Sequence, residues 1–280
     1  MSRRHVLKTR ILALIALLFP SIGSAELTGD RHPWFDARFI LSGGAYFIDH
    51  DYKIGAGVNL PGQDVDFDET FGVDDSQTSY TGMVRWNFGE KWSFRTQGFR
   101  FKVEGSAVLK KDVQWDDYIL KAGSNASAGV SNTIIRGFFG RKLSEGPRHE
   151  FGAGAGLHWL KVKAYAAGEA FVGDGEVTES IWGEVEADLP LPNIGAWYWY
   201  SPSPRWLITS RVDWFSASID EYSGGLWNAG IGAQFQISEN IGLGAEFSYF
   251  AIDGDVDKSD WKGKLESSST GPSVYLSFNW

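Results

Sequence analysis

Charged residues alternate with apolar ones along several stretches of this chain, and their spacing could build a polar interior. Arg85 lies between two apolar neighbours, and Arg211 and Asp213 flank Val212. Successive side chains of a strand point to opposite faces, so an apolar outer face leaves these charges on the inner face. The candidate residues of such an interior are Arg85, Arg95, Arg136, His158, Arg211, Asp213 and Glu246.

Two interpretations of these inward charges are open. They could form a polar constriction that selects solutes, or a network of ion pairs that fills a narrow interior. If these stretches are strands of a ten-stranded barrel, the barrel is only slightly wider than an eight-stranded one. The interior of an eight-stranded barrel is just filled by its side chains. Buried charges also have to be paired. Size and charge balance therefore favour the filled interior.

Two acidic runs place carboxylates at every second residue. They are Asp64, Asp66 and Asp68, and Asp253, Asp255 and Asp257. On an extended backbone each run presents three carboxylates on one face, and clustered carboxylates bind hard divalent cations. The second run begins like a helix-loop-helix calcium loop, but Lys258 and Lys264 stand where that loop needs Gly and Glu. The alternative is a solvated acidic loop, and we expect no other cofactor.

A catalytic site is harder to find. His50 lies between Asp49 and Asp51, which is the single grouping that suggests acid–base chemistry. No recognisable nucleophile accompanies a base. The chain has no Cys, which excludes disulfides, thiol catalysis and thiolate metal sites. We therefore expect no catalytic residues, with an enzyme acting on lipid or peptide as the alternative.

The C-terminal residues show the clearest strand pattern. Val274, Leu276, Phe278 and Trp280 alternate with Tyr275, Ser277 and Asn279, so one face is wholly apolar and the last residue is aromatic. Leu276, Phe278 and Trp280 resemble the C-terminal targeting signal of bacterial outer-membrane β-barrels. The resemblance implies a closing strand whose terminal aromatic lies at the membrane interface.

The N-terminal residues have the pattern of a secretion signal. Residues 2–10 are basic, residues 11–19 are apolar, and Gly23-Ser24-Ala25 is a small-residue cleavage site. The apolar run is too short to span a bilayer. We expect a signal peptide over residues 1–25 and a single barrel domain over residues 26–280.

Composition agrees with an exported β-barrel. The full chain has 26 basic and 35 acidic residues, and removal of the leader's four basic residues leaves 22 against 35, a net charge of −13. This charge argues against nucleic-acid binding. The chain has 34 Gly and 42 aromatic residues, yet its mean hydropathy is −0.21. Aromatic belts combined with a polar inner face explain both values.

The alternating stretches predict an all-β, up-and-down antiparallel transmembrane barrel. We count ten strands, with eight or twelve as alternatives, joined alternately by short turns and long loops. The long loops, expected outside the cell, lie near residues 52–77, 104–131, 163–193 and 252–271. In the third stretch the alternation slips near Gly98, which predicts a β-bulge.

Two segments suggest a family. Residues 60–75 and 189–195 look like segments of a largely uncharacterised family of proteobacterial outer-membrane barrels. That family carries no assigned chemistry to transfer. As an outer-membrane barrel, the chain is expected to be a structural protein or a narrow, porin-like pore for small solutes, with acidic extracellular loops. Its expected partners are membrane lipid, lipopolysaccharide and the barrel-assembly machinery, with the oligomeric state open. A rim enzyme and a soluble β-sandwich are the competing hypotheses.

Overall fold

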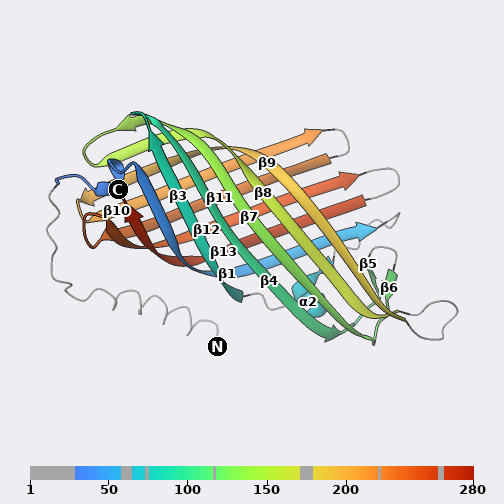
Figure 1. Cartoon of the computed structure of the whole chain (residues 1–280). Helices are drawn as coiled ribbons and strands as arrows, with labels where there is room; N and C mark the ends of the chain where they lie inside the picture. Colours follow the sequence, from blue (N-terminus) through green and yellow to red (C-terminus); the bar gives the residue numbers. More distant parts are fainter. Residues whose placement is uncertain are drawn as a thin grey trace.

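Ten long antiparallel strands form a closed barrel (Figure 1). The computed structural model describes residues 29–57, 65–72, 76–115, 118–170, 179–219, 222–257 and 262–280. The barrel strands are β1 (Phe39–Gly57), β3 (Ser76–Phe88), β4 (Trp92–Val108), β7 (Asn125–Glu145), β8 (His149–Ala170), β9 (Glu179–Ser203), β10 (Trp206–Ile219), β11 (Tyr222–Gln236), β12 (Ile241–Asp257) and β13 (Lys262–Asn279). The expected signal peptide lies outside the described residues.

The first and last strands close the barrel. β1 pairs with β13 from Ile40 opposite Asn279 to Gly57 opposite Lys262. The backbone carbonyl of Trp280 accepts hydrogen bonds from the amides of Arg38 and Phe39, at 2.8 and 2.9 Å. The prediction of a ten-stranded up-and-down barrel is therefore confirmed, and the β-sandwich hypothesis is wrong, because closure leaves no second sheet.

The two ends of the barrel differ. At one end, here called the turn end, the C-terminus lies beside the short turns at residues 89–91, 146–148, 204–205 and 237–240. This end also holds the 3-10 helix η1 (Pro33–Phe35). The opposite end, the loop end, carries β2 (Val65–Asp66), α2 (Phe67–Phe71), β5 (Val113–Trp115) and β6 (Tyr118–Leu120) (Figure 1). In the described part of the chain, no helix has the length and apolar character to cross a membrane.

Most strands are longer than the sequence pattern predicts. β8 has 22 residues and β9 has 25, whereas about 9–11 residues cross a bilayer. The strands therefore run well into the four ranges expected to be loops. The pattern failed there because the outward residues become charged, as at Lys161 and Lys163 of β8, although the backbone pairing with β9 continues.

The outer surface near the turn end is an apolar, aromatic band. Aromatic rings follow one another across neighbouring strands: the exposed Trp280 stacks on the half-buried Phe39 (5.6 Å between centroids), and Phe39 stacks on the exposed Trp86 (6.3 Å). Trp92 stacks on Phe139 at 5.0 Å. Nearer the loop end, Trp159, Trp214, Trp227 and Tyr249 are exposed in the same way. Two aromatic belts flanking an apolar band are expected of a lipid-facing barrel surface.

The predicted bulge near Gly98 is absent. β4 keeps an unbroken register with β3 and with β7 through Gly98. Phe101 and Val103 instead point inward and are 3% and 5% exposed. The alternation slips in the sequence because the interior itself changes, from polar near the turn end to apolar near the loop end. An apolar residue facing a core was read from sequence as one facing outward.

Candidate functional site

The interior at the level of the apolar band is crossed by buried ion pairs. Arg85 of β3 donates to Glu150 of β8 at 2.7 Å, and both side chains are 1% exposed. Trp197 of β9 donates its indole N–H to the same carboxylate oxygen, also at 2.7 Å. The Arg85 guanidinium lies 4.1 Å from the ring centre of Trp199. This group connects β3 to β8 and β9 directly across the lumen.

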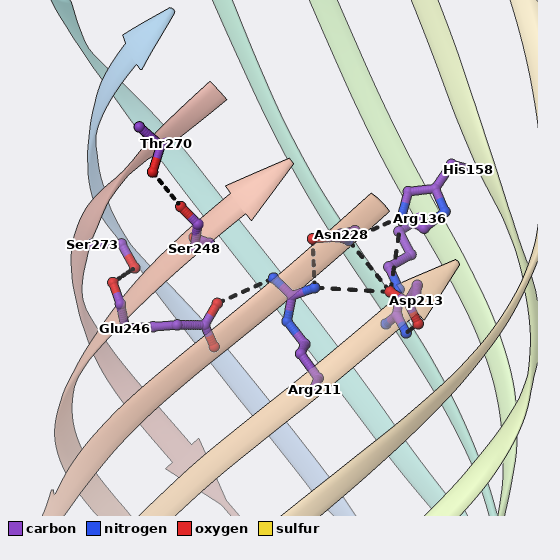
Figure 2. Close-up of polar contacts among 9 residues, drawn as sticks. All are labelled: Arg136, His158, Arg211, Asp213, Asn228, Glu246, Ser248, Thr270 and Ser273. Carbon is purple, nitrogen blue, oxygen red and sulfur yellow. Dashed lines mark hydrogen bonds and ion pairs between the residues drawn. The ribbon is translucent and has the colours of Figure 1, made fainter. Parts of the chain in front are cut away.

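A second group lies on β7, β8, β10 and β11 (Figure 2). Arg136 donates to Asp213 at 2.7 Å, and Asp213 is fully buried. Asn228 donates to the other oxygen of Asp213 at 3.3 Å, and its amide nitrogen lies 3.0 Å from Nε2 of His158. His158 Nδ1 lies 3.1 Å from the amide oxygen of Asn193. These contacts join protein groups to one another, so the cluster fixes side chains in place.

A third ion pair continues the network towards β12. Arg211 bonds to Glu246 at 3.2 Å and to Asn228 at 2.8 Å, and lies 3.8 Å from Asp213 (Figure 2). The structure therefore brings Arg136, His158, Arg211, Asp213 and Glu246 together in one connected network. Arg85 belongs to the separate group with Glu150.

Sequence reasoning missed Glu150 and the aromatic residues that surround Arg85. Glu150 precedes the outward Phe151, so its position in the alternation already pointed inward. Trp197 and Trp199 were missed as well, because the alternation put Ala196, Tyr198 and Tyr200 on one face without deciding which face lies outside. The tyrosines are 45% and 39% exposed and the tryptophans 5% and 2%, so the tryptophans form the inner face.

An aromatic segment occupies the lumen at the turn end. η1 inserts Trp34 and Phe35, each 3% exposed, against Trp199, with ring centres 5.4 and 6.4 Å apart. Arg31 lies 3.5 Å from Glu145 at the end of β7. His32 accepts a hydrogen bond from the amide of Trp34 at 3.2 Å. Burial disfavours its charged form and lowers the pKa of His32 to about 4.

Two small cavities lie between this segment and the charged network. The first, of about 50 Å³, is lined by Trp34, Arg95, Trp199, Arg211, Glu246 and Tyr275, among others. The second, of about 30 Å³, shares Arg211 and Glu246 with the first and reaches His158 and Arg136. Such volumes hold a few water molecules.

An apolar core fills the lumen nearer the loop end. Its buried members include Ile48, Phe71, Phe101, Val130, Leu160, Leu226 and Phe250. Phe71 comes from α2, so this short helix covers the core from above. Sequence reasoning placed no core at this level, because α2 and Val130 lie in ranges expected to be loops, and the slip that brings Phe101 inward was read as a bulge.

The candidate catalytic grouping is not assembled. His50 points inward, stacks on Phe101 at 3.8 Å, and has its Nδ1 3.0 Å from the hydroxyl of Ser269. Asp49 and Asp51 are exposed on the outer face of β1. Neighbouring residues of a strand point in opposite directions, so these carboxylates and the imidazole cannot share a site.

The acidic runs also differ from the prediction. Asp64 lies outside the described residues, Asp66 ends β2, and Asp68 belongs to α2, so the first run is not one extended segment. Asp253 and Asp255 are exposed on β12, and the side chain of Asp257 lies outside the described residues. Among the described residues, no three His, Cys, Asp or Glu side chains are grouped to hold a metal ion.

Comparison with solved structures identifies the architecture. The outer membrane protease OmpT from Escherichia coli superposes with a TM-score of 0.58 at 11% identity, covering 93% of this chain and 100% of that one. The fold is that of an outer-membrane β-barrel. Two other outer-membrane barrels match more distantly: the Pseudomonas putida toluene transporter TodX (TM-score 0.40, 10% identity, 88% and 90% covered) and OprG from Pseudomonas aeruginosa (0.35, 10%, 91% and 99%). No family model and no curated protein matches the sequence.

Proposed function

We propose that this protein is an integral protein of the bacterial outer membrane whose barrel is a closed support for a structure outside the cell. The turn end faces the periplasm and the loop end faces outward, as short turns and long connections do in such barrels. The single observation that carries the closed state is the pair Arg85–Glu150, whose side chains are 1% exposed inside the lumen. A wide aqueous path would leave these charges in contact with water.

The filling at three successive levels supports the same conclusion. Trp34 and Phe35 occupy the periplasmic end, the ion pairs occupy the middle, and the apolar core with Phe71 occupies the outer end. A charged solute would have to lose its water to pass such a core. The narrow-pore interpretation would require at least the first and last of these layers to move.

The strands beyond the lipid-facing band form the external structure. Lys161 and Lys163 on β8 face Glu184 and Glu186 on β9, with Lys161 Nζ 2.6 Å from Glu186. These side chains point outward and are roughly 40% exposed. Exposed charges of this density require water, so the lipid boundary on this wall lies near Trp159. The rigid wall above it offers a surface for lipopolysaccharide or a protein partner.

Planar-bilayer conductance of the refolded mature protein tests the closed state. We expect no discrete openings from protein whose folding is verified by heat-modifiable gel mobility. A variant lacking residues 26–37, which removes Trp34 and Phe35, controls for the contribution of the periplasmic segment. Discrete openings in the unmodified protein, altered by Arg136→Ala, would contradict the closed state and make the chain a selective pore.

The rim-enzyme alternative has lost its candidate residues, because His50 is inside the barrel and Asp49 is outside it. The resemblance in fold to OmpT carries no catalytic group to this chain at 11% identity.

A further inference from the structure

The charged lumen contains one more positive charge than negative charge. Between the aromatic segment and the apolar core, the described inward-facing charges are Arg85, Arg95, Arg136 and Arg211 against Glu150, Asp213 and Glu246. Three of the arginines have a carboxylate partner: Arg85 has Glu150, Arg136 has Asp213, and Arg211 has Glu246. Arg95 is the fourth.

Arg95 has no ion pair within the part of the chain that the structure describes. Its one specific contact is with the face of Trp199, at 5.5 Å from the ring centre. Glu246 lines the same cavity as Arg95, but it bonds to Arg211 at 3.2 Å. An arginine does not lose its proton in a protein, so this charge persists.

The accessible part of the Arg95 side chain faces the cavity of about 50 Å³. Thr209, Arg211, Trp199 and Tyr275 line the same cavity, so it combines a second guanidinium with hydroxyl groups and aromatic walls. Arg95 is half-buried and borders this cavity. A charge without a carboxylate partner in so confined a space is costly, because only a few water molecules fit beside it. At about 50 Å³ the cavity accommodates a small ion but not a bulky organic anion such as gluconate.

We propose that this cavity binds a small monovalent inorganic anion, of the size of chloride, between Arg95 and Arg211. The anion balances the lumen charge and is a structural component of the folded barrel. Binding of this anion goes beyond the closed-support function, because a closed barrel needs no bound ion. The bond to Arg95 is electrostatic and involves no proton transfer.

The test uses the full mature chain, refolded from urea in either sodium chloride or sodium gluconate, so that no ion has to enter a folded barrel. Thermal unfolding is followed by gel mobility. The midpoint of the unmodified protein is expected to rise with each tenfold increase in chloride, as for any ligand that binds only the folded state. Gluconate does not fit the cavity, so raising its concentration is expected to leave the unfolding midpoint unchanged.

Arg95→Gln separates a bound anion from a general salt effect. This variant removes the unpaired charge, so its midpoint in gluconate is expected to exceed that of the unmodified protein and to show no chloride dependence. Arg100→Gln, on the exposed outer part of the same strand, is the matched control and should keep the full chloride response. An equal chloride response in Arg95→Gln, or none in the unmodified protein, would overturn the proposal.

A second measurement places the ion. Crystals of protein refolded in bromide are expected to show an anomalous peak within hydrogen-bonding distance of the Arg95 guanidinium. An empty or water-filled cavity under these conditions overturns the proposal independently of the stability data.

Discussion

Arg85 and Glu150 meet at 2.7 Å across the lumen, although two strands, β4 and β7, separate their own strands around the barrel wall. Their side chains therefore brace the wall from inside and do not merely join neighbouring strands. The contact also fixes Trp197, which bonds to the same carboxylate oxygen. This contact across the lumen explains why the side chains inside the barrel at this level are held in fixed positions.

Breaking this pair on one side should destabilise the barrel strongly. Arg85→Met or Glu150→Gln each leaves a buried charge without its partner, and we expect a loss of about 3–5 kcal/mol in the free energy of unfolding. The double variant should lose far less than the sum, because it removes both charges and the introduced amide oxygen can still accept from Trp197. Urea unfolding of all four proteins in lipid vesicles measures the coupling. Additive losses would show that the two residues do not interact.

A methyl group at Gly152 should obstruct packing of the lumen. A Cβ atom there would overlap the ring of Trp197 and approach the carbonyl oxygen of Arg141, which belongs to the paired backbone of β7. We expect Gly152→Ala to lower the free energy of unfolding by about 1–3 kcal/mol or to abolish refolding. Gly82→Ala is the control, since the nearest atom would be 3.8 Å away. Refolding yield by gel mobility compares the two, and equal yields would argue against the close packing.

Acid should loosen the aromatic segment at the turn end. His32 is held neutral with a pKa of about 4, whereas the unfolded chain binds a proton near 6.5. The free energy of unfolding therefore has its full value above pH 6.5, where His32 is neutral in both the folded and the unfolded chain. It falls as the pH drops, by about 3 kcal/mol at pH 4. His32→Asn keeps an acceptor for the Trp34 amide and does not titrate in this range. Stability measured from pH 7 to 4 should fall less steeply in this variant, and parallel curves would contradict the assignment.

Two phenylalanines of β4 should respond differently to truncation. Phe101 is 3% exposed in the apolar core, and Phe101→Ala should cost about 3–5 kcal/mol of unfolding free energy because it leaves a cavity. Phe94 is 41% exposed on the outer band, where lipid fills the space left by Phe94→Ala, so its loss should be smaller. Unfolding in lipid vesicles compares them. A larger loss at Phe94 would mean that the two faces of β4 were assigned wrongly.

The sequence by itself determined the face to which most strand residues point. Period-two alternation correctly placed Val212 outside and His158 inside, and the C-terminal pattern correctly placed Leu276, Phe278 and Trp280 on the outer face. The ten stretches of alternating polarity, separated by turn residues, were enough for the strand count. These features are local, since each depends only on residues adjacent in the chain.

The tertiary structure alone decided which inward residues meet. Alternation cannot say that Arg85 reaches Glu150 or that Arg95 is left beside a cavity, because that depends on strand tilt and stagger around the closed barrel. It also cannot tell an apolar core from a lipid-facing wall, since both select the same side chains, and Phe101 was misassigned for this reason. Asp68 shows the third limit: its run of alternate carboxylates suggested an extended chain, but packing of Phe71 over the core accompanies a helical turn there.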